Sequence, residues 1–172
     1  SFCDTVEAVR KEYGLTPVFF ALEPERDTAP CRSVMDMLEG ERFFISAPRD
    51  EKLIIGMMRK MRVIVSMRLH TLIFASCVGA KLAAVSYDPK VTGFMRYIGQ
   101  KHCIAFEDVT AERLTALIGQ TLSDDEPKKP QGGFWRNKHE TDRLPCHFAV
   151  VSHPDAQAAG HEPHSGRGDL VF

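Results

Sequence analysis

Short apolar runs and longer amphipathic segments alternate along the first two thirds of the chain. The apolar runs show little internal alternation, which is typical of strands buried on both faces of a sheet. We therefore predict strands at residues 16–22, 42–46, 63–66, 82–87 and 102–105.

The segments between these runs have the spacing and end signals of helices. Gly14 and Gly40 are predicted to stop helices, and Asp50 is predicted to cap one. The predicted helices are residues 4–13, 27–38 (a loop that includes Asp27, followed by a helix), 50–60, 69–78, 89–98 and 109–122. Regular alternation of strands and helices favours an α/β fold: a Rossmann-like parallel sheet with helices on both faces. This domain is expected to span residues 1–122.

The composition changes after Leu122. Residues 123–172 are rich in Pro, Gly, His and charge, and their one apolar run, at 147–151, is short. We expect this tail to be disordered or loosely packed. It contains a set of metal-ligating residue types whose spacing matches no zinc finger or ribbon, so no metal site is predicted. These residues are Cys146, His147, His153, His161 and His164.

Composition and charge narrow the class of protein. The chain has 172 residues and a formal net charge of −1, so charge gives no reason to expect nucleic-acid binding. No apolar run approaches the roughly 20 residues of a membrane span. The five cysteines are odd in number and scattered, without a C-x-x-C pair, which favours reduced thiols and a cytoplasmic location. Cys77 lies in an apolar run and is expected in the core.

Two charged turns follow the predicted strands at 63–66 and 82–87. The first contains Arg68 and His70, and the second contains Tyr87, Asp88 and Lys90. Parallel α/β sheets bind ligands outside the carboxyl ends of their strands. Arginine binds phosphate or carboxylate with two parallel hydrogen bonds, helix starts favour anions, and histidine transfers protons near neutral pH. The two turns therefore indicate a site for an anionic ligand.

Each turn also has a purely structural interpretation. Arg68 could pair with a nearby acid, and His70 could pack locally. Asp88 is a good helix cap and Pro89 a good first helical residue, which together account for the Asp-Pro pair without a ligand. Lys90 and Tyr87 are then left for binding.

Two motifs at this spacing resemble a known family. MRLHTLIFA at residues 67–75, followed by VSYDPKV at 85–91, is similar to the polysaccharide pyruvyl transferases of the CsaB type. The resemblance covers residues 4–122. It implies the carboxyl-terminal half of a GT-B fold, in which an amino-terminal domain forms the other wall of a cleft.

The resemblance also implies an activity. The family transfers a pyruvyl group from phosphoenolpyruvate to a cell-wall polysaccharide sugar and forms a ketal, without a cofactor. Its Arg-Leu-His motif corresponds to Arg68, Leu69 and His70, which implies donor binding, and the implied site extends to Tyr87, Asp88 and Lys90. His70 could exchange a proton or simply hold the donor. The implied partners are phosphoenolpyruvate and a saccharide acceptor. Because the other domain would form half of the cleft, we expect little turnover by this chain alone.

One departure and two alternatives accompany this resemblance. Lys81 stands where the family usually has proline, which is expected to loosen the start of the next strand. A GT-B glycosyltransferase half that binds a nucleotide sugar is a second interpretation, with Glu107 or Asp108 accepting hydrogen bonds from ribose hydroxyls. A non-catalytic, truncated remnant is a third.

Overall fold

The described residues form one parallel sheet of six strands. A computed structural model describes residues 1–46, 51–124 and 147–151. The strands lie in the order β2-β1-β6-β3-β4-β5, and every neighbouring pair is parallel. Their bounds are β1 Thr16–Ala21, β2 Phe43–Ser46, β3 Val63–Ser66, β4 Leu82–Ser86, β5 Cys103–Ala105 and β6 His147–Val151. The predicted α/β class with a parallel sheet is confirmed.

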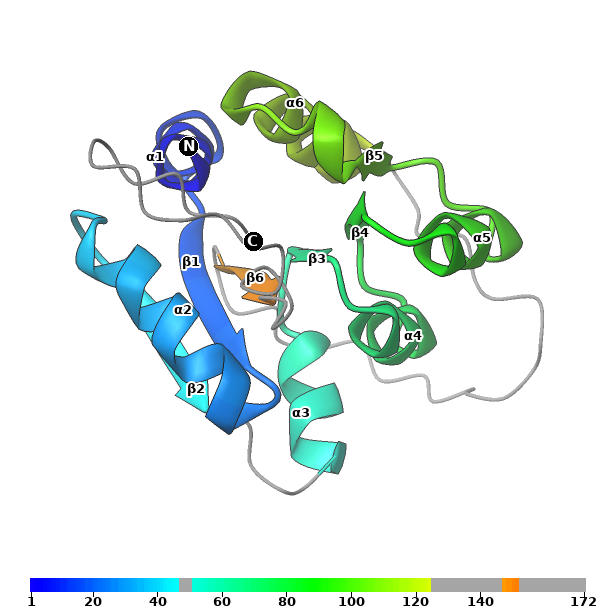
Figure 1. Ribbon diagram of the computed structural model, residues 1–172, viewed down its shortest axis with the longest axis horizontal. Coiled ribbons are helices and arrows are strands. Elements are labelled where there is room, and N and C mark those ends of the chain that lie inside the picture. The colour runs from blue at the N-terminus through cyan, green and yellow to red at the C-terminus, as the bar shows by residue number, and fades with distance from the viewer. Residues whose placement is uncertain (47–50, 125–146, 152–172) are drawn as a thin grey trace, which may run out of the picture.

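Helices cover both faces of this sheet, as the sequence predicts (Figure 1). One face carries α1, α2 and α6, and the other carries α3, α4 and α5. The helices are α1 Phe2–Tyr13, α2 Pro24–Asp36, α3 Glu51–Met58, α4 Leu69–Cys77, α5 Pro89–Tyr97 and α6 Ala111–Ser123, with a 3₁₀ turn η1 at Phe106–Asp108.

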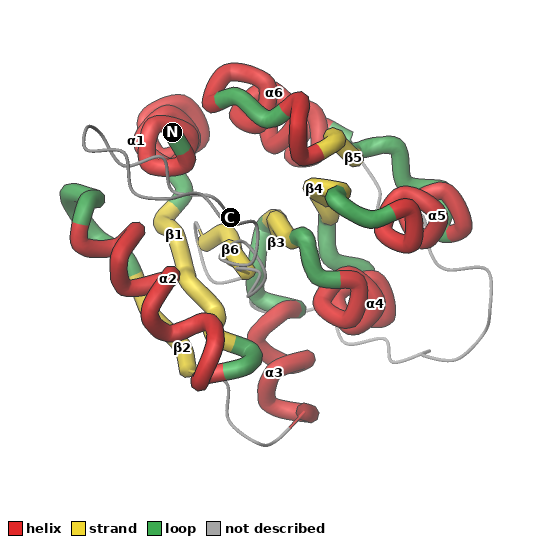
Figure 2. The backbone as a smooth tube through the Cα atoms, in the orientation of Figure 1, coloured by secondary structure: helices red, strands yellow, loops and turns green. Residues whose placement is uncertain are grey.

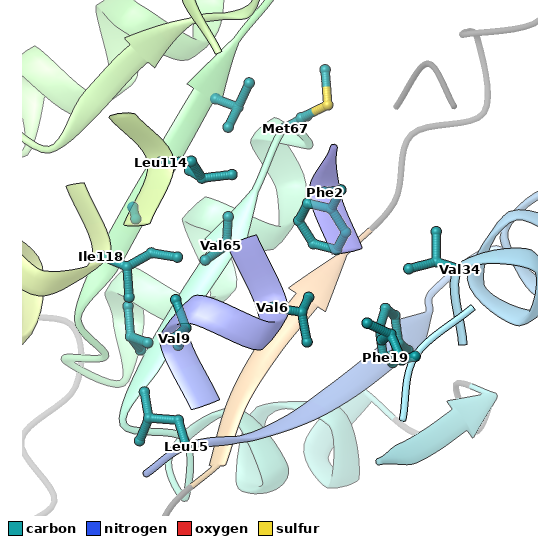
Figure 3. Close-up of a cluster of buried hydrophobic side chains, with 14 of the residues drawn as sticks. Phe2, Val6, Val9, Leu15, Phe19, Val34, Val65, Met67, Leu114 and Ile118 are labelled. Carbon is teal, nitrogen blue, oxygen red and sulfur yellow. The ribbon is translucent and has the colours of Figure 1, made fainter. Parts of the chain in front are cut away.

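The apolar core is divided by the sheet into two layers. Successive side chains of a strand point to opposite faces. Val63 and Val65 accordingly join the cluster under α1, α2 and α6, whereas Ile64 joins the cluster under α3, α4 and α5. Figure 3 shows the first cluster, in which Val6 of α1 and Ile118 of α6 lie close to Val65. Each fully buried aliphatic side chain stabilises the fold by about 1.5–3 kcal/mol.

The start of α2 differs from the prediction. The helix begins at Pro24 rather than after a loop that includes Asp27, so Asp27 lies in its first turns. Pro24 suits the first helical position because its ring fixes a helical φ. The Asp27 carboxylate also accepts a hydrogen bond from the Glu23 backbone N–H at 2.8 Å, which satisfies a donor at the helix start. The predicted cap at Asp50 lies outside the described residues.

Strand β6 corrects the expectation for the tail. We expected residues 123–172 to be loosely attached, yet His147–Val151 forms a strand between β1 and β3. Its short apolar run is long enough for a five-residue strand. The rest of the tail after Asp124 lies outside the described residues, together with its cysteine and histidine side chains.

Lys81 stabilises the start of β4, where we expected a looser connection. Its Nζ donates hydrogen bonds to the Leu122 carbonyl at 2.5 Å and to the Asp124 carbonyl at 2.6 Å. A lysine at this position therefore holds the end of α6 against the start of β4. Two part-buried carbonyls at the helix end gain a cationic donor in this way.

The position of Cys77 differs from the prediction. Cys77 is exposed, contrary to the expectation that it lies in the core, because it is the last residue of α4 and faces away from the sheet-facing residues Leu72 and Ala75.

None of the helices in residues 1–46 and 51–124 combines the length and apolarity that a bilayer crossing requires.

Candidate functional site

The candidate site lies along the carboxyl edge of the sheet. Strands β3 and β4 are parallel neighbours, and each runs directly into the first turn of a helix, α4 or α5. Figure 2 shows the two connecting loops beside each other at this edge. Helix α2 follows β1 on the opposite face of the sheet. The edge between β1 and β3 is thus the point where the connections diverge to the two faces, which is where open α/β sheets place ligands.

Arg68 joins the starts of α2 and α4. Its Nη2 donates to Asp27 Oδ1 and its Nη1 donates to Glu23 Oε1. Asp27 is fully buried and the Arg68 side chain is 11% exposed, whereas the Glu23 side chain is 50% exposed. The local interpretation, in which Arg68 pairs with a nearby acid, therefore describes this conformation.

The two carboxylates play different parts. Asp27 uses one oxygen for Arg68 and the other for the Glu23 backbone N–H, so its burial is compensated by hydrogen bonds. Glu23 lies half in water, where an ion pair contributes at most about 1 kcal/mol. An incoming anion would have to displace Glu23 from Nη1, and that exchange is far cheaper than the displacement of buried Asp27.

Matching serine turns build the two strand ends. Ser66 Oγ accepts a hydrogen bond from the Arg68 backbone N–H at 3.0 Å. Ser86 Oγ donates to the Asp88 carbonyl at 3.0 Å and lies 2.7 Å from Thr92 Oγ1. Each serine fixes the backbone two residues further on, immediately before a helix. The spacing Ser-x-Arg and Ser-x-Asp is visible in the sequence, and it is the signal that could have identified these serines.

The second turn combines a structural cap with exposed groups. Asp88 Oδ1 accepts the Lys90 backbone N–H at 2.8 Å and caps α5, as its structural interpretation predicts. The Lys90 side chain is exposed at the helix start, and Tyr87 is 49% exposed. Among the described residues, the Lys90 ammonium forms no ion pair. A cation at this position adds positive charge beside the N-terminal N–H groups of α5.

His70 and Leu69 begin α4 and have different surroundings. His70 is exposed, and its ring has no hydrogen-bond partner within the part of the chain that is described. Leu69 is half-buried and packs against the core cluster beneath α4. In this conformation Leu69 anchors the helix start, while the His70 imidazole is accessible to a ligand at the edge.

The acids proposed for a nucleotide ligand lie beyond β5. Glu107 and Asp108 are in η1, and Asp108 Oδ1 accepts a hydrogen bond from Arg113 Nη1 at 2.6 Å. Both side chains of that pair are more than half exposed. Asp108 is therefore already engaged at the same sheet edge, although by an exposed ion pair that is easily broken.

Sequence reasoning did not include Glu23 in the site. Its position before the Pro24 helix start resembles an ordinary cap, and 45 residues separate it from Arg68 along the chain. These two residues meet only because the carboxyl ends of β1 and β3 lie on either side of β6 in the folded sheet. No pattern of spacing in the sequence could have shown this contact.

Comparison with known proteins assigns no family to this chain. The chain finds no match among protein-family models, curated proteins or solved structures. The fold is described by its own geometry, as an α/β, Rossmann-like arrangement with a parallel sheet.

Proposed function

We propose that this chain is the phosphoenolpyruvate-binding domain of a pyruvyl transferase that forms a ketal on a cell-wall polysaccharide sugar. The observation that carries the proposal is the position of Arg68, His70 and Lys90 at the starts of two adjacent helices on one sheet edge. The resemblance of the same two turns to pyruvyl transferases supports it. The GT-B architecture belongs to this proposal as well.

The donor has a phosphate and a carboxylate, and this edge offers a complementary group for each. Arg68 Nη1 becomes available to one anionic group when exposed Glu23 turns into solvent, while Asp27 keeps the guanidinium in place. The exposed Lys90 ammonium offers charge and donors to the other, at the positive end of the α5 dipole. Glu23 thus contacts Arg68 Nη1 where an anionic group of the donor would bind.

The reaction requires two new carbon–oxygen bonds and one proton on carbon. One sugar hydroxyl oxygen attacks the enol carbon that bears the phosphate ester, and the neighbouring methylene carbon gains a proton and becomes a methyl group. A second hydroxyl oxygen then replaces the phosphate, which leaves with its bonding electron pair. His70 is an accessible acid–base group at this edge and would donate or accept one of these protons.

Calorimetric titration of phosphoenolpyruvate into the full chain tests the proposal. Arg68→Ala should abolish binding, whereas Arg113→Ala, which removes an exposed arginine elsewhere on the edge, should leave it unchanged. Glu23→Gln should tighten binding about 2- to 5-fold, because it removes the carboxylate that competes for Nη1. Circular dichroism of each variant separates loss of binding from loss of fold.

Opposite effects of Arg68→Ala and Glu23→Gln are the signature of this site. Absence of binding by the folded wild-type chain and by Glu23→Gln would refute donor binding by this domain. Displacement of bound donor by uridine or adenosine diphosphate, with tighter binding of the nucleotide, would instead support the nucleotide-sugar alternative.

A further inference from the structure

Among the described residues, only strand β6 connects the two halves of the sheet, β2-β1 and β3-β4-β5, through hydrogen bonds. Val150 is paired with Phe19 of β1 on one side and with Val65 of β3 on the other. Strands β1 and β3 are therefore two strand spacings apart, about 10 Å, and share no hydrogen bonds with each other. Without β6, the main-chain groups on the facing edges of β1 and β3 would lose their partners.

The handedness of the connections shows which segment suits this position. The connection from β1 through α2 to β2 crosses the face that carries α1 and α6, and it moves outward from β1 to β2. Helix α1 lies on the same face and leads into β1. Parallel crossovers are right-handed in about 98% of cases, so connections over one face move in the same direction. A strand joined to the amino end of α1 would consequently lie on the side of β1 away from β2.

That place is the one β6 occupies. The order β2-β1-β6-β3-β4-β5 corresponds to the doubly wound order 3-2-1-4-5-6, with β6 in the position of strand 1. In that fold strand 1 runs directly into the helix that precedes strand 2, which here is α1. Strand β6 instead reaches the position from the carboxyl-terminal side, after α6.

The surroundings define the chemistry of a suitable strand. Phe19 and Val65 face the cluster on one side, and Phe20 and Ile64 face the cluster on the other. All four are at most 4% exposed. A strand between them is covered on both faces, so it must be apolar at successive positions and supply every N–H for the ladder.

We propose that the position between β1 and β3 is a strand-exchange site whose matched occupant is an extended apolar segment joined to the amino end of α1. Such a segment displaces β6, because its tether places it beside the site in the handedness that the fold favours. Both strands are parallel to β1 and β3, so exchange leaves the direction of the sheet unchanged.

The test adds a strand to the full chain ahead of Ser1. One variant carries the sequence of residues 147–151, HFAVV, followed by a three-residue Gly/Ser linker. The matched control carries the same extension with proline at its second and fourth positions, which removes two ladder donors. Hydrogen exchange with mass spectrometry then follows the backbone amides of β3 and β6.

The apolar extension should increase exchange at residues 147–151 at least about 10-fold, a change of roughly 1.4 kcal/mol in opening free energy. Residues 63–66 should stay protected, and the proline control should leave β6 protected. Equal protection of β6 in both variants would overturn the proposal.

A second comparison tests occupation of the same position when β6 itself is weakened. In an Ala149→Pro background β6 cannot complete its ladder. The apolar extension should then restore the urea midpoint that Ala149→Pro lowers, and the proline extension should not. Equal midpoints with the two extensions would also overturn the proposal.

Discussion

Asp27 holds Arg68 from the opposite face of the sheet. Asp27 lies in the first turn of α2 and Arg68 directly precedes α4, and their ion pair lies where β1 and β3 end on either side of β6. Because Asp27 is fully buried and Arg68 nearly so, the pair is shielded from solvent. The same contact therefore fixes the candidate ligand-binding arginine and joins two helices of different layers.

Removal of the buried carboxylate should destabilise the chain strongly. Asp27→Asn leaves Arg68 without its buried counter-charge, and loss of one partner from a buried pair costs about 3–5 kcal/mol. Glu23→Gln is the matched control, since its half-exposed ion pair contributes less than about 1 kcal/mol. Urea denaturation measures both. Equal, small losses of stability would show that the Asp27–Arg68 pair is not formed in solution.

The end of α6 should contribute stability that depends on pH. The hydrogen bond from His102, at 2.6 Å, lowers the pKa of the Asp124 carboxyl, and Lys101 adds a favourable charge. A lowered pKa in the folded state means that this contribution is fully present above the ordinary pKa of aspartate. It is lost as the pH falls from that value through the lowered one.

Asp124→Asn is the variant that measures this contribution. Wild type should be the more stable protein at pH 6, and the difference should shrink as the pH falls below about 4. Thermal unfolding between pH 2.5 and 6 provides the measurement. A difference that is constant over this range would mean that the Asp124 charge is not responsible for it.

Two glycines in helices should respond to alanine in opposite directions. A Cβ at Gly119 of α6 would lie 2.2 Å from Tyr13 Oη and 2.9 Å from Tyr13 Cζ, whereas a Cβ at Gly93 of α5 meets nothing within 4 Å. Gly119→Ala should therefore cost about 1–3 kcal/mol through overpacking of α1 against α6. Gly93→Ala should stabilise α5 by about 0.5–1 kcal/mol.

The Tyr13 contact can be separated from other effects of alanine. In a Tyr13→Phe background the hydroxyl is absent, and Gly119→Ala should cost measurably less than it does in wild type. An unchanged cost would place the strain elsewhere than at Tyr13. Chemical denaturation of the four variants in this cycle gives the coupling.

Strand β6 should be intolerant of a missing backbone donor. Ala149 is paired with Val18 of β1 and with Ile64 of β3, so the strand has ladder partners on both sides. Ala149→Pro should cost about 3 kcal/mol or more, while Ala149→Gly, which keeps its N–H, should cost about 0.5–1 kcal/mol. Urea midpoints decide between them. Similar costs for the two variants would argue against a central position for this strand.

Local pattern was enough to predict most elements because their determinants lie within a few residues. Val63–Ser66 is found as predicted, since a continuous apolar run suits a strand covered on both faces. Asp88 and Pro89 begin α5 by cap geometry that involves only their neighbours. The positions of Arg68, His70 and Lys90 on one sheet edge likewise follow from the parallel α/β pattern.

Contacts between distant segments could not be predicted in the same way. His147–Val151 is a weak strand signal by itself, and only the ladders offered by β1 and β3 make it a strand in the middle of the sheet. The sequence predicts a looser connection at Lys81 because the partners of this lysine, the carbonyls at the end of α6, lie about 40 residues away along the chain.

The sequence by itself determined the succession of strands and helices, the faces that they bury, and the charged residues at the strand ends. These properties depend on the periodicity and capping of short segments. The tertiary structure alone decided that β6 completes the sheet and that Asp27 and Glu23 share Arg68. These features depend on which strand edges and buried charges meet in the folded chain. A buried charge or strand edge is stable only with a hydrogen-bonding or charged partner, and that partner can lie far away in the sequence.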